Sequence, residues 1–467
     1  MAKELPMKRN FINISLLTTL ILSGCSLAPT LQVPTIEQPT KQKSVLHVKE
    51  KWWEIFGDTT LNSLIEEALI HNDDLKLSAL RILKAKQTYG LSDANLYPTL
   101  NATGSFSKQQ TSGETYQKKE NAYTEYSLGL SLQYEIDFWG KLSNQAESNW
   151  SLYLGSEMAR QTVTNTLIND IIQAYLNLAS LEERIKILNE TIENYRQSYE
   201  FRSKQHQAGS INELLATQSL AQYNNSSATK GVLLETKIAQ QSALALLLGK
   251  SPKELFEGEK PLITHLPSPI IVPNGVSSDL LENRPDVQEA LMSLKSKNAL
   301  IGVERSAYFP SISLTGSYGQ QSENSGNLFQ SSATKWGFGP TFTLPIFDFG
   351  KINTKVEMSK TDLQSALISY EQTVKKAYKE VYDALSKQEL IQNRLSFNEN
   401  EIKSYQKMVY ITTTRFEDGA ANWLEVLDSQ KSLLNASLTH VTTRQTLLSA
   451  QAELFKALGG GWNQTLK

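Results

Sequence analysis

Cysteine is nearly absent from this sequence: Cys25 is the only one among 467 residues, so a disulfide within the chain is excluded. An excess of charge is also lacking. The formal net charge is -2 and Lys and Arg form no long cluster, which argues against nucleic acid as a partner. Beyond the N-terminus, no apolar run approaches the roughly 20 residues that a membrane-spanning helix requires.

Recognisable catalytic motifs are missing as well. The sequence contains no HExxH, GxSxG or CxxC pattern, and its five histidines are scattered without metal-ligand spacing. Gly249-Lys250-Ser251 resembles the end of a phosphate-binding loop, but Leu244 stands where the first glycine of that loop belongs, so we expect a helix cap instead. We therefore predict that the protein is not an enzyme and has no metal site and no cofactor.

The N-terminus carries an export signal. Basic residues precede a short apolar run at residues 11–22, so residues 1–24 are predicted to be a signal peptide. The Leu-Ser-Gly motif that ends this segment, followed by Cys25, resembles a bacterial lipobox, which implies a covalent lipid on Cys25. Ser26 follows, where Asp favours retention in the inner membrane, so we expect the outer membrane. The candidate start residues are Met1 and Met7.

The mature chain is an internal duplication. Residues 74–106 align without gaps on residues 286–318, and the junction motif at residues 136–141 matches residues 346–351. Two repeats of about 210 residues therefore account for most of the protein. The predicted segments are a signal peptide (1–24), a lipidated N-terminal segment (25–56), the first repeat (57–250), a linker (251–274), the second repeat (275–460) and a C-terminal tail (461–467).

Each repeat is predicted to contain a helix, a strand hairpin, a very long helix and a last helix. The predicted bounds are hairpins at 98–138 and 310–348, long helices at 141–206 and 351–416, and last helices at 211–249 and 421–457. In the hairpins, apolar and small polar residues alternate with the period of a strand, as in Tyr126, Leu128, Leu130 and Leu132 and, in the second repeat, from Trp336 to Ile346. The polar positions carry almost no Lys or Arg, unlike a solvated surface.

Four such strands cannot close a barrel, and open sheet edges are not tolerated in lipid. Three copies of the chain would supply twelve strands, of a length suited to a tilted membrane strand. The long helices contain no proline and carry a heptad pattern, as at Ile171, Ala174, Leu178 and Leu181, with Gln388 and Asn398 as polar interruptions in the second repeat. This spacing predicts left-handed coiled coils about 100 Å long.

These features together resemble the outer membrane factor family, the TolC-like tunnel proteins, and most closely its lipoprotein branch in tripartite efflux. The residues that carry the resemblance are the lipobox, the segment at residues 51–56, Arg284-Pro285-Asp286, and the strand–helix junctions at Pro98, Gly140, Pro310 and Gly350. The resemblance implies an α+β membrane protein. Its homotrimer would form a twelve-stranded outer-membrane barrel, with four strands per chain, continuous with a long periplasmic α-helical barrel.

The resemblance also implies an exit channel for drugs or other small toxic compounds, lipid-anchored in the cell outer membrane and reaching into the periplasm. Its partners would be a periplasmic adaptor protein, an inner-membrane pump of the RND type and outer-membrane lipid. Glu425 and Asp428 would form the periplasmic gate, although acids early in a helix also complement its dipole. Gly209 and Gly419 would contact the adaptor, although glycine also simply ends helices.

Three other functions compete with this interpretation. A type I protein-secretion duct shares the same architecture, and the lipobox favours small-molecule efflux over it. A structural coiled-coil lipoprotein without a pore would not need four lipid-compatible strands. A passive porin would build its whole barrel from one chain, which the long helices argue against.

Overall fold

The fold is taken from a computed structural model that describes residues 26–33, 51–110, 112, 114, 122–256, 263, 265–270 and 284–460. The signal peptide, Cys25 and the tail at 461–467 lie outside the described residues, as does much of the linker. The chain divides into two compact units. The first contains residues 1–36, 81–157 and 289–371, and the second contains residues 37–80, 158–288 and 372–467.

The helices reproduce the duplication in their lengths. α3 (Asp73–Ala94) and α8 (Pro285–Ser306) have 22 residues each, α4 (Lys141–Gln207) and α9 (Lys351–Glu417) have 67 each, and α5 (Glu213–Leu247) and α10 (Trp423–Ala457) have 35 each. The units do not coincide with the repeats, because both long helices contribute to both units. Among the described residues, none of these helices is both long and apolar enough to cross a membrane.

The segment before the first hairpin differs from the single helix that the sequence predicts. It forms two helices, α2 (Thr59–His71) and α3, separated at Asn72. Asn72 has an extended backbone, so it ends α2. Its side-chain oxygen accepts a hydrogen bond from the backbone N–H of Leu75 at 3.1 Å, which caps the start of α3. The Asn72 cap therefore divides this segment into two helices, although the apolar pattern of the sequence continues through Asn72.

Short elements complete the described chain. A 3-10 helix, η1 (Trp52–Phe56), buries Trp52 against Phe455 of α10, with ring centroids 5.6 Å apart and nearly parallel planes. The remaining short helices are α6 (Pro252–Phe256) in the linker and η2 (Ser325–Asn327) and η3 (Ser331–Ala333) in the second hairpin. The segment at residues 51–56 thus packs on the end of the last long element of the chain.

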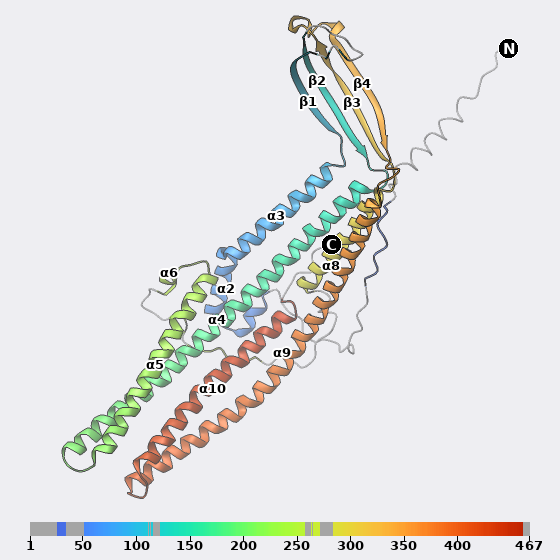
Figure 1. The fold of residues 1–467 in the computed structure, drawn as a ribbon. Coiled ribbons are helices and arrows are strands. Elements are labelled where there is room, and N and C mark those ends of the chain that lie inside the picture. The colour runs from blue at the N-terminus through green and yellow to red at the C-terminus, as the bar shows by residue number, and fades with distance from the viewer. Residues whose placement is uncertain are drawn as a thin grey trace, which may run out of the picture. The chain divides into compact units, whose positions relative to one another are not determined.

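Four antiparallel strands form one sheet in the first unit, in the order β1-β2-β3-β4 (Figure 1). They are β1 (Thr99–Gln109), β2 (Tyr123–Ile136), β3 (Ser311–Ser322) and β4 (Thr334–Thr343). In register, Leu130 lies opposite Tyr318 and Tyr318 opposite Trp336, whereas Ser131 lies opposite Ser317. The sheet therefore has one apolar face and one face of small polar residues, as the alternation predicts.

The last strand ends earlier than its apolar pattern suggested. Leu344 and Ile346, which continue the alternation in the sequence, lie beyond β4, because that strand ends at Thr343. Pro345 follows this end, and proline cannot donate to the ladder. The alternation of apolar residues in the sequence therefore continues for several residues after the pairing of β4 with β3 ends.

The heptad of α4 forms a core in the second unit. Ile171, Ala174, Leu178 and Leu181 are all buried, and Leu181 joins Leu188, Leu233 of α5 and Leu434 of α10 in one cluster. The corresponding heptad of α9 holds two buried amides, Gln388 and Asn398, whose side-chain oxygens have no hydrogen-bond partner among the described residues. Buried polar groups at heptad positions cost stability and fix register.

Candidate functional site

Two helical turns that share one geometry end the long helices, one between α4 and α5 and the other between α9 and α10 (Figure 1). Gly209 and Gly419 occupy the left-handed region at φ 73° and 72°. In each turn the glycine N–H donates to the carbonyl three residues earlier and the next N–H donates to the carbonyl five residues earlier, at 2.7 to 3.1 Å. This is the hydrogen-bonded ending for which helices use glycine.

The space around these two glycines is open. A Cβ added at Gly209 or Gly419 would meet no heavy atom within 4 Å. The backbone angle therefore explains the choice of glycine, and close packing inside the chain does not. The backbone at each glycine is therefore accessible to a partner molecule.

Glu425 is part of the cap that starts α10. The side chain of Asn422 accepts a hydrogen bond from the Glu425 N–H at 3.1 Å, and the Glu425 carboxylate accepts one from the Asn422 N–H at 3.4 Å. Together these bonds form a capping box. The local role that the sequence offered as an alternative for Glu425 is therefore present.

Asp428 lies one turn later on the same exposed side of α10, while Val426 and Leu427 point into the core. Neither Glu425 nor Asp428 forms an ion pair with any residue that the structure describes. The first repeat has Leu215 and Gln218 at the matching positions, so the pair of carboxylates belongs to the second repeat alone.

A buried arginine, which no pattern in the sequence indicated, lies close to these turns. The Arg202 guanidinium of α4 is 4.0 Å from the ring centroid of Trp423 and 4.7 Å from that of Phe416. Within the described part of the chain it has no carboxylate partner, and burial lowers the pKa of Arg202. Trp423 also donates to the Ser219 hydroxyl at 3.2 Å. The helix pair α4–α5 is joined here to the pair α9–α10 by cation–π contacts and one hydrogen bond.

The type of junction residue depends on the order of the two elements that it joins. Pro98 and Pro310 each stand one residue before a strand, after α3 and α8 have ended. Gly140 and Gly350 each stand directly before a long helix, with φ 71° and 81°. Proline therefore lies where a helix gives way to a strand, and glycine lies where a strand gives way to a helix.

Two aspartates start the long helices, and the sequence analysis did not single them out. Asp137 accepts from the backbone N–H groups of Leu142 and Ser143 at 2.9 and 2.7 Å. Asp348 accepts from the N–H groups of Gly350 and Ile352 at 2.9 and 2.7 Å. Both carboxylates satisfy N–H groups that a helix start leaves unpaired, and their charge suits the helix dipole. Their place within the matched junction motifs was the available signal.

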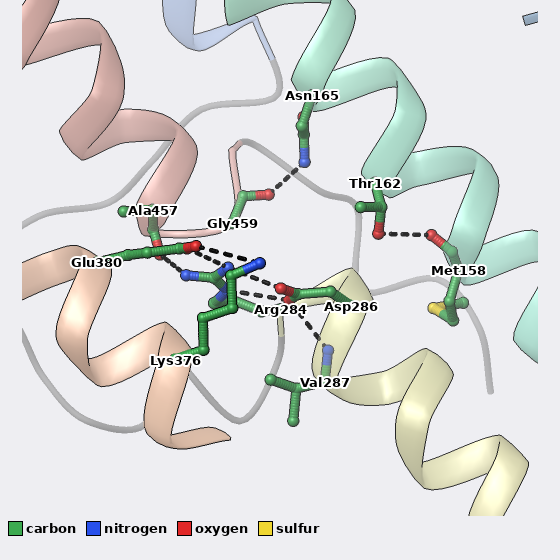
Figure 2. Close-up of polar contacts among 10 residues, drawn as sticks. All are labelled: Met158, Thr162, Asn165, Arg284, Asp286, Val287, Lys376, Glu380, Ala457 and Gly459. Carbon is green, nitrogen blue, oxygen red and sulfur yellow. Dashed lines mark hydrogen bonds and ion pairs between the residues drawn. The ribbon is translucent and has the colours of Figure 1, made fainter. Parts of the chain in front are cut away.

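The Arg284-Pro285-Asp286 motif builds a buried clasp in the second unit (Figure 2). The Arg284 side chain is 7% exposed and donates to Asp286 at 2.7 and 3.0 Å, to Glu380 of α9 at 2.8 Å, and to the Ala457 carbonyl of α10 at 2.7 Å. Burial alone would lower the pKa of Arg284, but the hydrogen bonds and charges of Asp286 and Glu380 outweigh it and raise that pKa. One side chain thus joins the start of α8, the end of α10 and the middle of α9.

The first repeat has an uncharged version of this clasp. Asn72 donates to the Leu247 carbonyl at 2.9 Å, just as Arg284 donates to Ala457. Gly249 follows at φ 68°, and a Cβ there would lie 2.6 Å from the carbonyl oxygen of His71. Gly249 therefore ends α5 in close contact with α2, which agrees with the helix-cap interpretation of Gly249-Lys250-Ser251.

The residues directly after Cys25 bind to α4 and α8 in the first unit. The Ser26 hydroxyl donates to Asn144 at 3.0 Å, Asn298 donates to the Pro29 carbonyl at 2.8 Å, and Arg305 donates to the Leu27 carbonyl at 3.2 Å. A Cβ at Gly302 would lie 2.9 Å from the Ala28 nitrogen. Cys25 itself lies outside the described residues, so its lipidation stays a prediction.

No group of three or more His, Cys, Asp or Glu residues with the geometry of a metal site occurs among the described residues. The predicted lack of a metal, of a cofactor and of catalysis stays a prediction.

The family model for outer membrane efflux protein matches residues 64–250 and 276–460, which is one match for each repeat. The cation efflux system protein CusC of Escherichia coli O6:H1 is 35% identical over 463 residues, covering 95% of this chain and 97% of that protein. The probable outer membrane lipoprotein SilC of Salmonella typhimurium is 34% identical over 469 residues, covering 96% and 98%.

A solved structure with the same fold is the Campylobacter jejuni CmeC outer membrane channel. It has a TM-score of 0.90 and 26% identity, covering 95% of this chain and 96% of that chain. The match extends over both repeats, because nearly the whole chain is covered.

Proposed function

Because this chain belongs to the outer membrane efflux protein family, we propose that three copies assemble into the exit duct of a tripartite efflux machine. An inner-membrane pump of the RND type would supply the energy, and a periplasmic adaptor would join pump and duct at the turns around Gly209 and Gly419. The duct itself is passive and gated. A covalent lipid on Cys25 would hold the mature N-terminus in the outer membrane.

The family confirms the coarser part of this interpretation. The chain is an outer-membrane efflux channel with the predicted duplicated α+β fold, and it reaches from the outer membrane into the periplasm. The adaptor, the pump type, the gate and the assembly in three copies belong to the proposal.

The observation that carries the proposal is the sheet, which has two different faces and two free edges. Among the described residues, β1 pairs only with β2, and β4 pairs only with β3. Unpaired backbone groups are not tolerated in lipid, so β1 of one copy must pair with β4 of the next. The apolar face would then meet lipid, and the small polar residues would line the duct.

The helices next to these edges support assembly as well. α3, which precedes β1, and α9, which follows β4, both expose large apolar side chains in the single chain. Exposed examples are Leu80 (61%), Leu91 (67%), Met358 (64%) and Phe397 (73%). Exposed apolar residues of this number on coiled-coil helices favour packing against further helices.

The substrates we propose are small cations and cationic toxic compounds. Glu425 and Asp428 occur once per chain, so three copies would place a ring of carboxylates at the entrance, and such a ring favours cations. The relative in Escherichia coli is named as a cation efflux protein. A type I protein-secretion duct stays the alternative that shares this architecture.

The decisive experiment is single-channel recording of the purified, lipidated full chain in a planar bilayer, after its oligomer mass has been measured. We expect a trimer with small, cation-selective openings that divalent cations block. A monomer would contradict the duct. So would a trimer that never conducts, even without the two carboxylates, because that result favours a structural coiled-coil lipoprotein.

The gate is tested by the double variant Glu425→Gln and Asp428→Asn. The glutamine side chain keeps an acceptor for the capping box, so the start of α10 stays intact. We expect conductance to rise on the order of a few-fold and cation selectivity to fall, since the ring loses its charge. Glu213→Gln, at an exposed acid in the first turn of α5, is the matched control and should change neither property. Unchanged selectivity in the double variant would remove both residues from the gate.

A further inference from the structure

A cavity of about 530 Å³ lies at the base of the sheet in the first unit, and none of the roles described above uses it. The ends of β2 and β4, the start of β3, the end of α8 and the starts of α4 and α9 surround it. This volume falls within the range of small-molecule pockets, which is roughly 300 to 1,000 Å³.

The register of the sheet tells which side the cavity occupies. Ser311 and Thr343 line it and lie opposite each other in the β3–β4 ladder, and Glu135 lines it from β2. All three belong to the face of small polar residues, because their ladder neighbours on that face include Ser313 and Thr341. Ile136, the last residue of β2, also lines the cavity and belongs to the apolar face. The cavity therefore lies mainly on the polar side of the sheet, the side that would line the duct.

Part of the cavity wall is aromatic and apolar. Trp139 and Phe309 both line it and stack with ring centroids 4.5 Å apart and planes at 22°. The Trp139 N–H donates to the Pro310 carbonyl at 2.8 Å, so the indole offers only its apolar surface. Val303 and Ile352 extend this apolar wall. A planar apolar group fits such a surface.

Several charged groups of the cavity already have partners. Glu135 and Lys141 form an ion pair at 2.9 Å. Asp137 and Asp348 are committed to the starts of α4 and α9 through backbone N–H groups. These four charges offer little to a ligand, because each is already neutralised or hydrogen-bonded.

Three charged groups remain for a ligand. Lys351 and Lys355 line the cavity one turn apart on α9, and Glu304 lines it from α8. None of the three side chains makes an ion pair or hydrogen bond to a residue that the structure describes. The cavity thus presents two free ammonium groups and one free carboxylate beside an aromatic wall.

We propose that this cavity is a transient binding site for zwitterionic amphiphiles with a planar apolar body. The anionic group of such a molecule would pair with Lys351 and Lys355, its amine with Glu304, and its ring with Trp139 and Phe309. The proposal rests on the proposed function, because the polar face lines a duct only in the assembled barrel. The site would extend the exported class from cations to zwitterions, and transport requires that it bind weakly enough to release each molecule.

The test compares three probes that share one ring system during single-channel recording of the full chain. 1-Naphthylalanine is zwitterionic, 1-naphthaleneacetate is anionic and 1-naphthylmethylammonium is cationic. We expect naphthylalanine to interrupt the current for the longest times. The double variant Lys351→Gln and Lys355→Gln should shorten these interruptions by about tenfold, because it removes both charge-assisted contacts. Glu304→Gln should shorten them too, and should make naphthylalanine and naphthaleneacetate alike.

Lys360→Gln is the control, since Lys360 lies on the same helix, outside the cavity, and pairs with Glu357. Equal dwell times in the parent and the double variant, or an equal change in the Lys360→Gln control, would overturn the site. Conductance without probe reports separately on the duct, so a failed duct and a failed site are distinguishable. If a variant does not conduct, naphthyl fluorescence titration of the solubilised full chain decides, and unchanged affinity for naphthylalanine again overturns the site.

Discussion

Two buried arginines of this chain are stabilised in different ways. Arg284 is surrounded by two carboxylates and a carbonyl oxygen, so every charge in its pocket has a partner. Arg202 instead lies against the faces of Trp423 and Phe416, and burial lowers its pKa because no described carboxylate compensates. The first arrangement is held by charge-assisted hydrogen bonds, and the second joins the helix pair α4–α5 to the pair α9–α10 through the faces of two aromatic rings.

Replacing Arg284 with Ala should destabilise the chain strongly. The change leaves Asp286, Glu380 and the Ala457 carbonyl without their buried donor, and breaking a buried ion pair costs about 3 to 5 kcal/mol. We expect the midpoint of thermal unfolding of the purified protein to fall by several degrees. Circular dichroism at 222 nm measures it, since the fold is mostly helical.

Lys376→Ala is the control for this change. Lys376 reaches Glu380 only at 3.8 Å and its side chain is 72% exposed, so its loss should cost less than about 1 kcal/mol. Similar losses in the two variants would show that the clasp does not depend on the buried guanidinium.

At single residues, the sequence predicted the local roles better than the distant contacts. Asn422 and Glu425 stand at capping-box spacing, so the alternative role of Glu425 could be read from neighbours in the chain. Arg202 and Trp423 are more than two hundred residues apart, and no local pattern connects them. Asp137 could have been found within its junction motif, but its role depends on where the helix begins.

Whole elements followed from periodicity, and their ends followed from local chemistry. The heptad of α4 and the alternation of β2 were visible because each repeats over many residues. The break at Asn72 and the end of β4 before Pro345 were missed, because one side-chain cap and one missing N–H interrupt patterns that otherwise run on. Local chemistry thus decided both endings.

The protein should become more stable when Gln388, a buried heptad residue of α9, is replaced with Leu. Gln388 is 6% exposed and its side-chain oxygen has no hydrogen-bond partner in the described part of the chain, so an apolar side chain of similar size removes a buried unsatisfied group. We expect a gain of about 1 kcal/mol in the free energy of unfolding, measured by urea denaturation. Gln392→Leu, at an exposed site on the same helix, should leave stability nearly unchanged. A loss at Gln388 would instead point to a bound water or a partner chain at this amide.

A substitution at Gly419 distinguishes the backbone role of this glycine from a role in contact with a partner. Asn tolerates the left-handed conformation, so Gly419→Asn should cost less than about 1 kcal/mol of stability. If the turn contacts the adaptor, the added side chain should still lower efflux, measured as increased sensitivity of cells to exported compounds. Gln406→Asn, at an exposed site on α9, should leave sensitivity unchanged. Full resistance with Gly419→Asn would argue against contact at this turn.

For the whole molecule, the duplication was the most informative feature of the sequence. It predicted paired helices of equal length, which the structure shows, and it accounts for a family match in two segments. It did not predict that the compact units would combine parts of both repeats. In the first unit that arrangement arises because β2 of the first repeat pairs with β3 of the second.

Cys25→Ser tests how the whole molecule is held in the membrane. If Cys25 carries several acyl chains, the variant should lose the corresponding mass and a large part of its retention in the outer-membrane fraction. Intact-protein mass spectrometry and membrane fractionation measure both effects. Ser26→Ala should keep the acyl mass, because it leaves the cysteine in place. A parental protein without acyl mass would contradict the lipobox.

The contacts of residues 26–29 also set an order of events. This segment leaves the ribosome and crosses the inner membrane first, yet its partners Asn298 and Arg305 lie 269 and 278 residues later in the chain. Those partners exist only after the whole first repeat and the start of the second have been exported. The beginning of the protein therefore completes its contacts late, and a chain truncated before α8 keeps only the hydrogen bond of Ser26 to Asn144 of α4.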